Sequence, residues 1–150
     1  INATPQSWSV GEITQQIAGA RAQSVTSGHV HFSMVALLQD RHGISTLLQT
    51  AAYAQAALVP TSPWLDAVAP RAPKLKALSA GKIMITPAAG KPVANYAIWR
   101  EREKAWEFSI QPASAPLVEA RGAEALVVSS IDRLGNESAR VTLRLNRPRL

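Results

Sequence analysis

Two histidines come closer to a metal-binding pattern than any other residues of this chain. His29 and His31 stand two residues apart in the run HVHFS, so in a strand both imidazoles would point to the same side. Imidazole is a common metal ligand, but a metal site needs further ligands and groups that orient them, and the sequence shows neither beside this pair. We therefore expect no metal and no other cofactor, and we interpret both histidines as polar lining residues.

Tryptophans are the second group with a chemical use, because an indole ring can stack on a sugar ring. Trp64, Trp99 and Trp106 all follow the histidines in the chain, and the last two lie in strand-like runs. Aromatic residues at strand spacing usually fill a core, since a large ring gains most from burial. We predict that these aromatics fill the core, with a sugar-binding platform of Trp99 and Trp106 as the alternative.

The histidines belong to a segment with the pattern helix, strand, helix. Apolar residues at spacings of three and four predict a helix over residues 10–23, and Ser9 with Glu12 predicts a capping box at its start. Residues 29–33 alternate as a strand does, and helical spacing resumes after them. One strand cannot satisfy its own backbone groups, so we expect this segment to be the tail of a larger α/β domain or to pair with another module.

The rest of the chain predicts an antiparallel β-sandwich. Residues 126–145, LVVSSIDRLGNESARVTLRL, contain two strand-like runs around a turn in which Gly135 and Asn136 tolerate positive φ angles. This pattern predicts a β-hairpin. Four further strand-like runs precede it, namely PKLKAL, GKIMIT, ANYAIWR and KAWEFSI.

Charge and proline content both change between these two parts. Residues 1–66 carry two basic and three acidic side chains, whereas residues 67–150 carry 14 basic and seven acidic ones. Four prolines between Pro60 and Pro73 discourage helix, so we place the domain boundary between residues 63 and 64. The basic residues are scattered along the strands without a recognition motif, so we expect no nucleic acid partner.

The composition excludes several other classes of protein. No apolar run approaches the roughly 20 residues of a membrane helix, so we expect no membrane-spanning segment. The chain has no cysteine, which excludes a disulfide framework and a thiolate metal site. It begins at Ile1 rather than at a methionine, and we expect that it is cut from a longer protein.

Two stretches of the chain resemble known families. ANYAIWR and SSIDRLGNES make roughly residues 70–146 similar to a fibronectin type III domain, although Leu126 stands where many members carry a tyrosine that ties a corner. Upstream, W-x-x-x-E-I-x-x-Q-I-x-x-x-R from Trp8 to Arg21, followed by GHVHFS, ALL, ALVP and PWLD, resembles the end of bacterial glycosyl hydrolase-like family 10. Members of that family are (β/α)8 barrels followed by such a sandwich.

The resemblance implies an α+β fold. Residues 1–63 would be the terminal βα elements of a truncated barrel, and residues 64–150 a fibronectin type III-like sandwich. Because barrel enzymes place their reacting groups at the ends of several strands, most of which would be absent, the resemblance implies no catalytic residue in this fragment. Asn2, His31 and Ser33 would lie toward the barrel mouth and touch sugar in the intact protein.

The function that follows is that of a non-catalytic C-terminal fragment of a glycoside hydrolase. The parent would act on a bacterial envelope glycan, with peptidoglycan as a candidate, and the sandwich would be an accessory or spacer domain. The resemblance implies a location in the cell envelope or periplasm, where the parent could carry a lipid anchor. The alternative is a stand-alone carbohydrate-binding or adhesion module without activity. Since a truncated barrel would expose apolar surface, we also expect self-association through the first segment.

Overall fold

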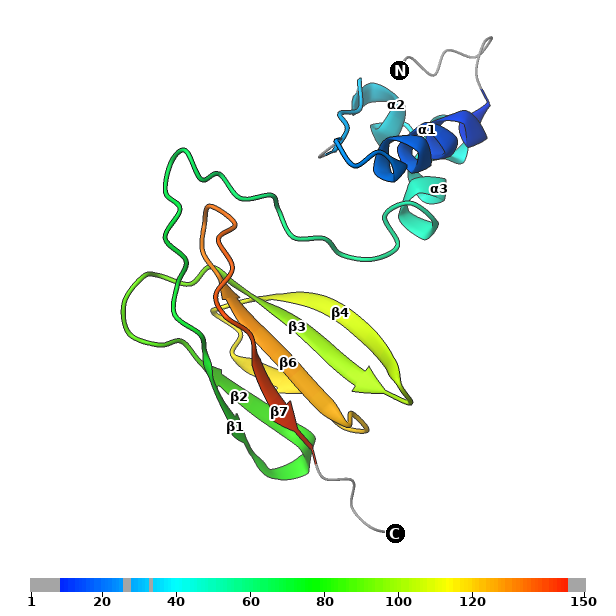
Figure 1. Ribbon diagram of the computed structural model, residues 1–150. Helices are drawn as coiled ribbons and strands as arrows, with labels where there is room; N and C mark the ends of the chain where they lie inside the picture. The colour runs from blue at the N-terminus through cyan, green and yellow to red at the C-terminus, as the bar shows by residue number, and fades with distance from the viewer. Residues whose placement is uncertain (1–8, 26–27, 33, 146–150) are drawn as a thin grey trace. The chain divides into compact units, whose positions relative to one another are not determined.

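The computed structural model describes residues 9–25, 28–32 and 34–145 (Figure 1). The chain divides into two compact units, Ile1–Gln55 and Ala56–Leu150, and each has a hydrophobic cluster of its own. In the described residues the first unit is helical, whereas the second consists of two antiparallel sheets. The fold is therefore mixed α and β, with most of the regular structure in a β-sandwich.

The first unit is held together by apolar residues of two short helices. Helix α1 (Val10–Ala22) confirms the predicted helix to within a residue, and its buried Ile13 and Ile17 pack with Ile44 and Leu48. This cluster explains why apolar residues recur at helical spacing in both segments. The remaining helical elements are α2 (Met34–Leu38), η1 (Arg41–Gly43) and α3 (Ile44–Thr50).

The start of α1 lacks the predicted capping box. Ser9 has the extended conformation of an N-cap residue, but its side chain makes no capping hydrogen bond. The Glu12 carboxylate instead accepts a hydrogen bond from Gln16 Nε2 at 3.1 Å, one turn further along the helix. The predicted capping box is therefore wrong. The Glu12 carboxylate, which was expected to bond to the Ser9 backbone, bonds to Gln16 four residues further along the helix.

The strand predicted over residues 29–33 is absent from the described part of that segment. Residues 28–32 follow an irregular path and pair with no strand. The physical reason is the one that made the segment look incomplete: a strand needs a neighbour for its backbone groups, and the described residues of the first unit offer none. Ser33 lies outside the described residues.

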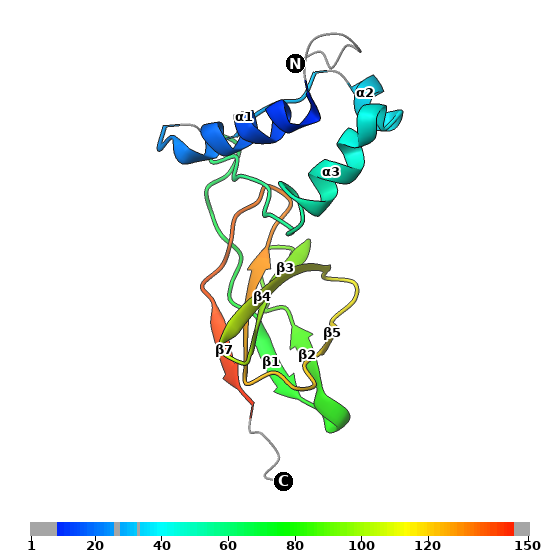
Figure 2. The ribbon, with the colours of Figure 1, turned by 90° about the vertical axis from the view of Figure 1, so that its right-hand side faces the viewer.

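The second unit contains seven strands in its described residues. One sheet has the order β1-β2-β5 and the other the order β4-β3-β6-β7, with every neighbouring pair antiparallel. Figure 1 shows the four-stranded sheet from β7 to β4, and Figure 2 shows β5 beside β2. The strands are β1 (Lys74–Ala77), β2 (Lys82–Thr86), β3 (Asn95–Arg102), β4 (Ala105–Pro112), β5 (Leu117–Glu119), β6 (Ala125–Ile131) and β7 (Val141–Arg144).

The two sheets enclose a core of aliphatic residues around one tyrosine. Tyr96, Ile98, Leu126 and Val128 are fully buried on the inner face of the larger sheet. They meet residues of the smaller sheet, among them Ile83, Ile85 and Val118. Because side chains alternate between faces, the neighbours of these residues along β3 and β6 point away from the core.

The prediction that the aromatics fill the core is therefore wrong for the tryptophans of the larger sheet. Trp99 pairs with Phe108 on one side and with Val127 on the other, and all three lie on the outer face. Trp106 lies on the same face of β4, with 51% of its surface exposed. The period of two gives the alternation of faces, but it does not tell which face meets the second sheet.

The segment before β1, residues 56–73, which we call the arm, is fastened to the sandwich. The Lys91 ammonium lies 2.8 Å from the Asp66 carboxylate of the arm and 2.6 Å from the Asp132 carboxylate of the β6–β7 turn. Asn136 donates to the Asp66 carbonyl at 3.0 Å and to Asp132 at 2.9 Å. These contacts join three parts of the chain that are far apart in sequence.

Candidate functional site

The outer face of the larger sheet carries a cluster of aromatic and aliphatic side chains, which we call the aromatic face. It consists of Trp99, Trp106, Phe108 and Val127, contributed by three neighbouring strands. The Trp99 and Phe108 rings lie 5.1 Å apart, tilted by 39°. Trp106 is the most exposed of the four, so part of an indole ring faces solvent at the edge of this cluster.

An arginine is stacked on the aromatic face. The Arg140 guanidinium carbon lies 4.1 Å from the centre of the Trp99 ring, a cation–π contact. Glu137 fixes the guanidinium by accepting from Nε at 2.8 Å and from Nη2 at 3.4 Å. The Ser129 hydroxyl donates to the same carboxylate at 2.8 Å. A chain of contacts thus holds a charged, planar group over an indole ring.

The charges of this pair stabilise each other. Partial burial would raise the pKa of Glu137, but the hydrogen bonds from Arg140 and Ser129 lower it below its ordinary value. The hydrogen bond to Glu137 in turn raises the pKa of Arg140. Both groups are therefore charged at neutral pH, and together they contribute no net charge to the aromatic face.

A shallow hollow of about 170 Å³ opens between Trp99, Trp106, Val127 and Arg140. Its volume is below the roughly 300–1,000 Å³ of pockets that enclose drug-sized ligands. Its walls combine an exposed ring with a fixed guanidinium. The hollow can therefore hold one small group that offers both an apolar surface and hydrogen-bonding atoms.

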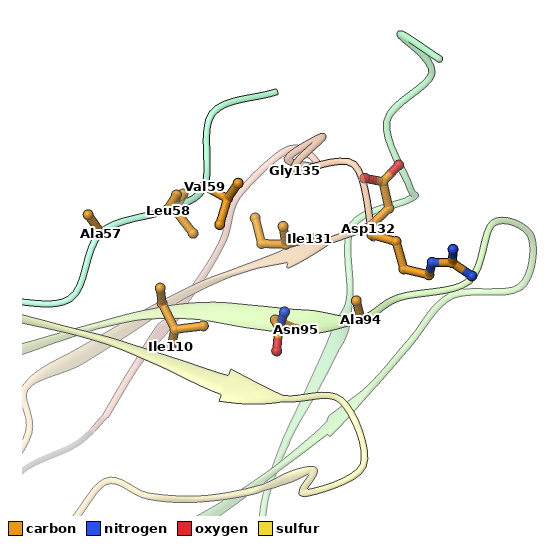
Figure 3. A pocket seen from close by; sticks show the side chains of 10 residues that line it. Ala57, Leu58, Val59, Ala94, Asn95, Ile110, Ile131, Asp132 and Gly135 are labelled. Carbon is orange, nitrogen blue, oxygen red and sulfur yellow. The ribbon is translucent and has the colours of Figure 1, made fainter. Parts of the chain in front are cut away.

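A second pocket, of about 350 Å³, lies between the arm and the larger sheet. Figure 3 shows Ala57, Leu58 and Val59 of the arm on one side, with Ile110 and Ile131 of the sheet facing them. Its lining is mainly aliphatic. Asn95, Asp132 and Arg133 add polar groups to this lining.

His31, one of the predicted sugar-contacting residues, is engaged with another side chain of the first unit. His29 Nε2 and His31 Nε2 each lie 2.5 Å from the Tyr53 hydroxyl. Burial and the nearby His29 lower the pKa of His31, which favours its neutral form. The sequence did not reveal Tyr53 as the partner, because the contact joins residues more than 20 positions apart. Asn2 and Ser33 lie outside the described residues, so their expected contact with sugar stays a prediction.

The described residues contain no group of three or more histidine, cysteine or acidic side chains that could hold a metal ion. The acidic residues of residues 1–66 have structural partners instead. Asp40, which had no evident partner in the sequence, accepts hydrogen bonds from the Ser45 amide at 2.7 Å and the Thr46 hydroxyl at 2.9 Å. Asp66 is paired with Lys91, and Glu12 with Gln16. No two of these three carboxylates share a hydrogen-bonding partner.

Sequence reasoning identified Trp99 and Trp106 but missed Arg140, which lines the hollow with them, and Glu137, which holds Arg140 in place. Arg140 stands two residues before Thr142, which pairs with Val127. Extending the alternation of β7 backwards by one step would have placed Arg140 beside the outer face. Glu137 had no such signal, because it lies in the turn between β6 and β7, where no strand period applies.

Comparison with known proteins supplies one functional relationship. Over 71 residues the chain is 39% identical to a protein named Glycosyl hydrolase YngK, from Bacillus subtilis (strain 168). The chain is related to a glycosyl hydrolase. The matched stretch covers 47% of this chain but 14% of that relative, so most of the relative has no counterpart here. No family model and no solved structure matches. Among the described residues, no helix is long and apolar enough to cross a membrane.

Proposed function

We propose that this chain is a non-catalytic C-terminal part of a glycoside hydrolase, with the sandwich as its accessory or spacer domain. The observation that carries the proposal is the 39% identity to a glycosyl hydrolase over a stretch that makes up 14% of that protein. A barrel enzyme needs groups from several strand ends, and the described part of the first unit contains no strand. Catalysis would belong to residues outside this chain.

The structure supports two finer parts of this proposal. Seven strands arranged as a three-stranded and a four-stranded antiparallel sheet are compatible with a fibronectin type III-like sandwich. The helices of the first unit, which pack on each other through one apolar cluster, are compatible with terminal helices of a (β/α)8 barrel. In that setting residues 29–33 would form a strand only when the adjacent barrel strand is present.

The substrate and location follow from the family resemblance. The parent would act on a glycan of the bacterial cell envelope or periplasm, with peptidoglycan as a candidate. Glycan would therefore be the partner of the intact protein, and Asn2, His31 and Ser33 would contact it near the barrel mouth.

Hydrolysis assays test the proposal directly. The 150-residue chain and a version extended upstream by the parent reading frame are incubated with purified peptidoglycan and with its peptide-free glycan strands. New reducing ends are then measured. We expect release by the extended protein and none by the chain alone. Turnover by the chain itself, or an upstream frame that does not encode alternating strands and helices, would contradict it.

The alternative function is that of a stand-alone carbohydrate-binding or adhesion module. The observation in its favour is the half-exposed Trp106 at the edge of the aromatic face. The extent of the parent reading frame separates the two proposals, because a stand-alone module needs no catalytic body.

A further inference from the structure

The exposure of Trp106 is the first step of the argument. Tyr96, Ile98, Leu126 and Val128 on the inner face of the larger sheet are fully buried, whereas Trp106 on the outer face leaves 51% of its surface in contact with solvent. Phe108 and Trp99 extend the same apolar surface across two strands. A contiguous exposed apolar patch is a candidate place for another molecule to bind.

The second step is the fixed guanidinium. Trp99 has one side covered by Arg140, so the freely accessible indole is that of Trp106. The Glu137 carboxylate accepts hydrogen bonds from two nitrogens of Arg140, and it also accepts one from the Ser129 hydroxyl. Binding to a group that is already ordered costs less side-chain entropy than binding to a mobile one. A ligand seated on Trp106 would therefore meet a polar edge that is ready to hydrogen-bond.

The third step concerns charge, and it selects the ligand. Arg140 is neutralised by Glu137. Another ion pair on the outer face joins Arg144 to Glu101, the residue that pairs with Trp106, at 3.8 Å. Polyanions bind through clusters of uncompensated cations, whereas Arg140 is the one cation among the residues that line the hollow. The hollow offers the apolar ring of Trp106 beside the Arg140–Glu137 pair, which can donate and accept hydrogen bonds. This combination suits a neutral molecule.

We propose that the hollow on the aromatic face is a binding subsite for one neutral pyranose ring of a glycan. The apolar face of the sugar would stack on Trp106, and its hydroxyl groups would hydrogen-bond to Arg140 and Glu137. A hollow of about 170 Å³ fits a single ring with the rest of the glycan outside it. This proposal deepens the glycan-related function given above, but it concerns binding by this chain and does not depend on a catalytic body.

Calorimetric titration of the full 150-residue chain tests the subsite. The probes are neutral oligosaccharides built from glucose, N-acetylglucosamine, galactose or mannose, together with heparin as a polyanion. We expect binding of at least one neutral probe, with less than a twofold change in affinity between about 50 and about 200 mM salt. Failure of all four neutral probes, or binding of heparin alone with a steep salt dependence, would overturn the proposal.

Variants locate the binding on the surface. Trp106→Ala should weaken the affinity about tenfold, which corresponds to the loss of about 1.4 kcal/mol of stacking. The matched control is Trp64→Ala, because Trp64 is 78% exposed but lies in the arm, outside both sheets. The control should bind like the unmodified chain, and both variants should keep the far-ultraviolet circular dichroism of the sandwich.

Arg140→Ala distinguishes a binding role from a covering role. If the guanidinium hydrogen-bonds to the sugar, this change weakens binding about tenfold even though it uncovers Trp99. The subsite would be contradicted by stronger binding in Arg140→Ala or by unchanged binding in Trp106→Ala. It would also be contradicted if the chain had no glycan affinity and Trp106→Ala abolished its self-association. Loss of hydrolysis by the parent would leave these titrations unaffected.

Discussion

At the residue scale, Asp132 is the charged side chain on which the attachment of the arm depends. Its side chain is 3% exposed, and it accepts hydrogen bonds from the Leu134 and Asn136 amides at 2.8 and 2.9 Å in addition to its ion pair with Lys91. Burial by itself would raise the pKa of this carboxyl, but the hydrogen bonds from Lys91 and Asn136 hold the pKa far below its usual range.

Asp132→Asn should therefore lower the free energy of unfolding and flatten its dependence on pH. A carboxyl whose pKa is depressed in the folded state stabilises the fold above its unfolded pKa, near 3.9, and loses that effect as the pH falls toward the folded value. The unmodified chain should thus lose stability steadily below about pH 4, and the variant much less. Urea unfolding at several pH values measures both slopes. Glu119→Gln, in the exposed pair with Lys82, serves as the control and should leave the slope unchanged.

Tyr96 gives a second prediction at this scale. Its ring is fully buried, and its hydroxyl has no hydrogen-bond partner among the described residues. A buried, unpaired hydroxyl costs on the order of 1–3 kcal/mol, whereas the ring itself fills the core. Tyr96→Phe should accordingly keep or raise the free energy of unfolding, by up to about 1 kcal/mol, while Tyr96→Leu lowers it. A clear loss in Tyr96→Phe during chemical denaturation would mean that the hydroxyl has a partner.

At the element scale, the sequence predicted most strands of the sandwich and helix α1 correctly, but it wrongly predicted a strand over residues 29–33, whose described part pairs with no strand. Six strands of the sandwich and helix α1 lie where apolar spacing placed them. Strand β5 has three residues and follows a proline-rich turn, so it offered no period. The candidate site was predictable in part, because alternation grouped Trp99 with its outer neighbours but could not say which sheet face is covered.

A substitution of Gly135, in the turn between β6 and β7, tests how the arm is attached to the sandwich. Gly135 has φ +81°, and a Cβ built on it would lie 2.8 Å from the Val59 carbonyl oxygen of the arm. Gly122 has a similar φ of +76° but open space around it. Both alanine variants suffer the left-handed strain of about 1–2 kcal/mol, but Gly135→Ala must also displace the arm. It should lose more stability in urea unfolding than Gly122→Ala. Equal losses would show that the arm is not held at this turn.

The same displacement should be visible in the arm itself. Hydrogen exchange reports local opening, and the Ser62 amide, which donates to the Leu134 carbonyl at 3.1 Å, is a direct probe. In Gly135→Ala this amide should exchange faster, while amides of β3 keep their protection. In Gly122→Ala the Ser62 amide should exchange as in the unmodified chain.

At the scale of the whole molecule, both units leave large apolar side chains in solvent. The sandwich encloses its core between two sheets and exposes such side chains mainly in the arm, among them Trp64 and Leu65, whereas in the first unit they belong to the helical segment itself. Val30 is 92% exposed, Leu38 78% and Met34 60%. Such a surface is a candidate for contact with another molecule, and the proposed barrel would cover it with further strands and helices.

We predict that the chain self-associates through this surface of the first unit. The sedimentation coefficient should rise with protein concentration, because contact between copies removes the exposed aliphatic groups from water. Leu38→Lys places a charge in that surface and should shift the equilibrium toward monomer. Leu65→Lys, at a residue of the second unit that is 67% exposed, is the matched control and should associate like the unmodified chain. If the chain sediments as a monomer at every concentration, or if both variants dissociate equally, the first unit is not the contact. In the proposed barrel the same aliphatic side chains would be buried within one molecule, so a version extended upstream by the parent reading frame should not associate.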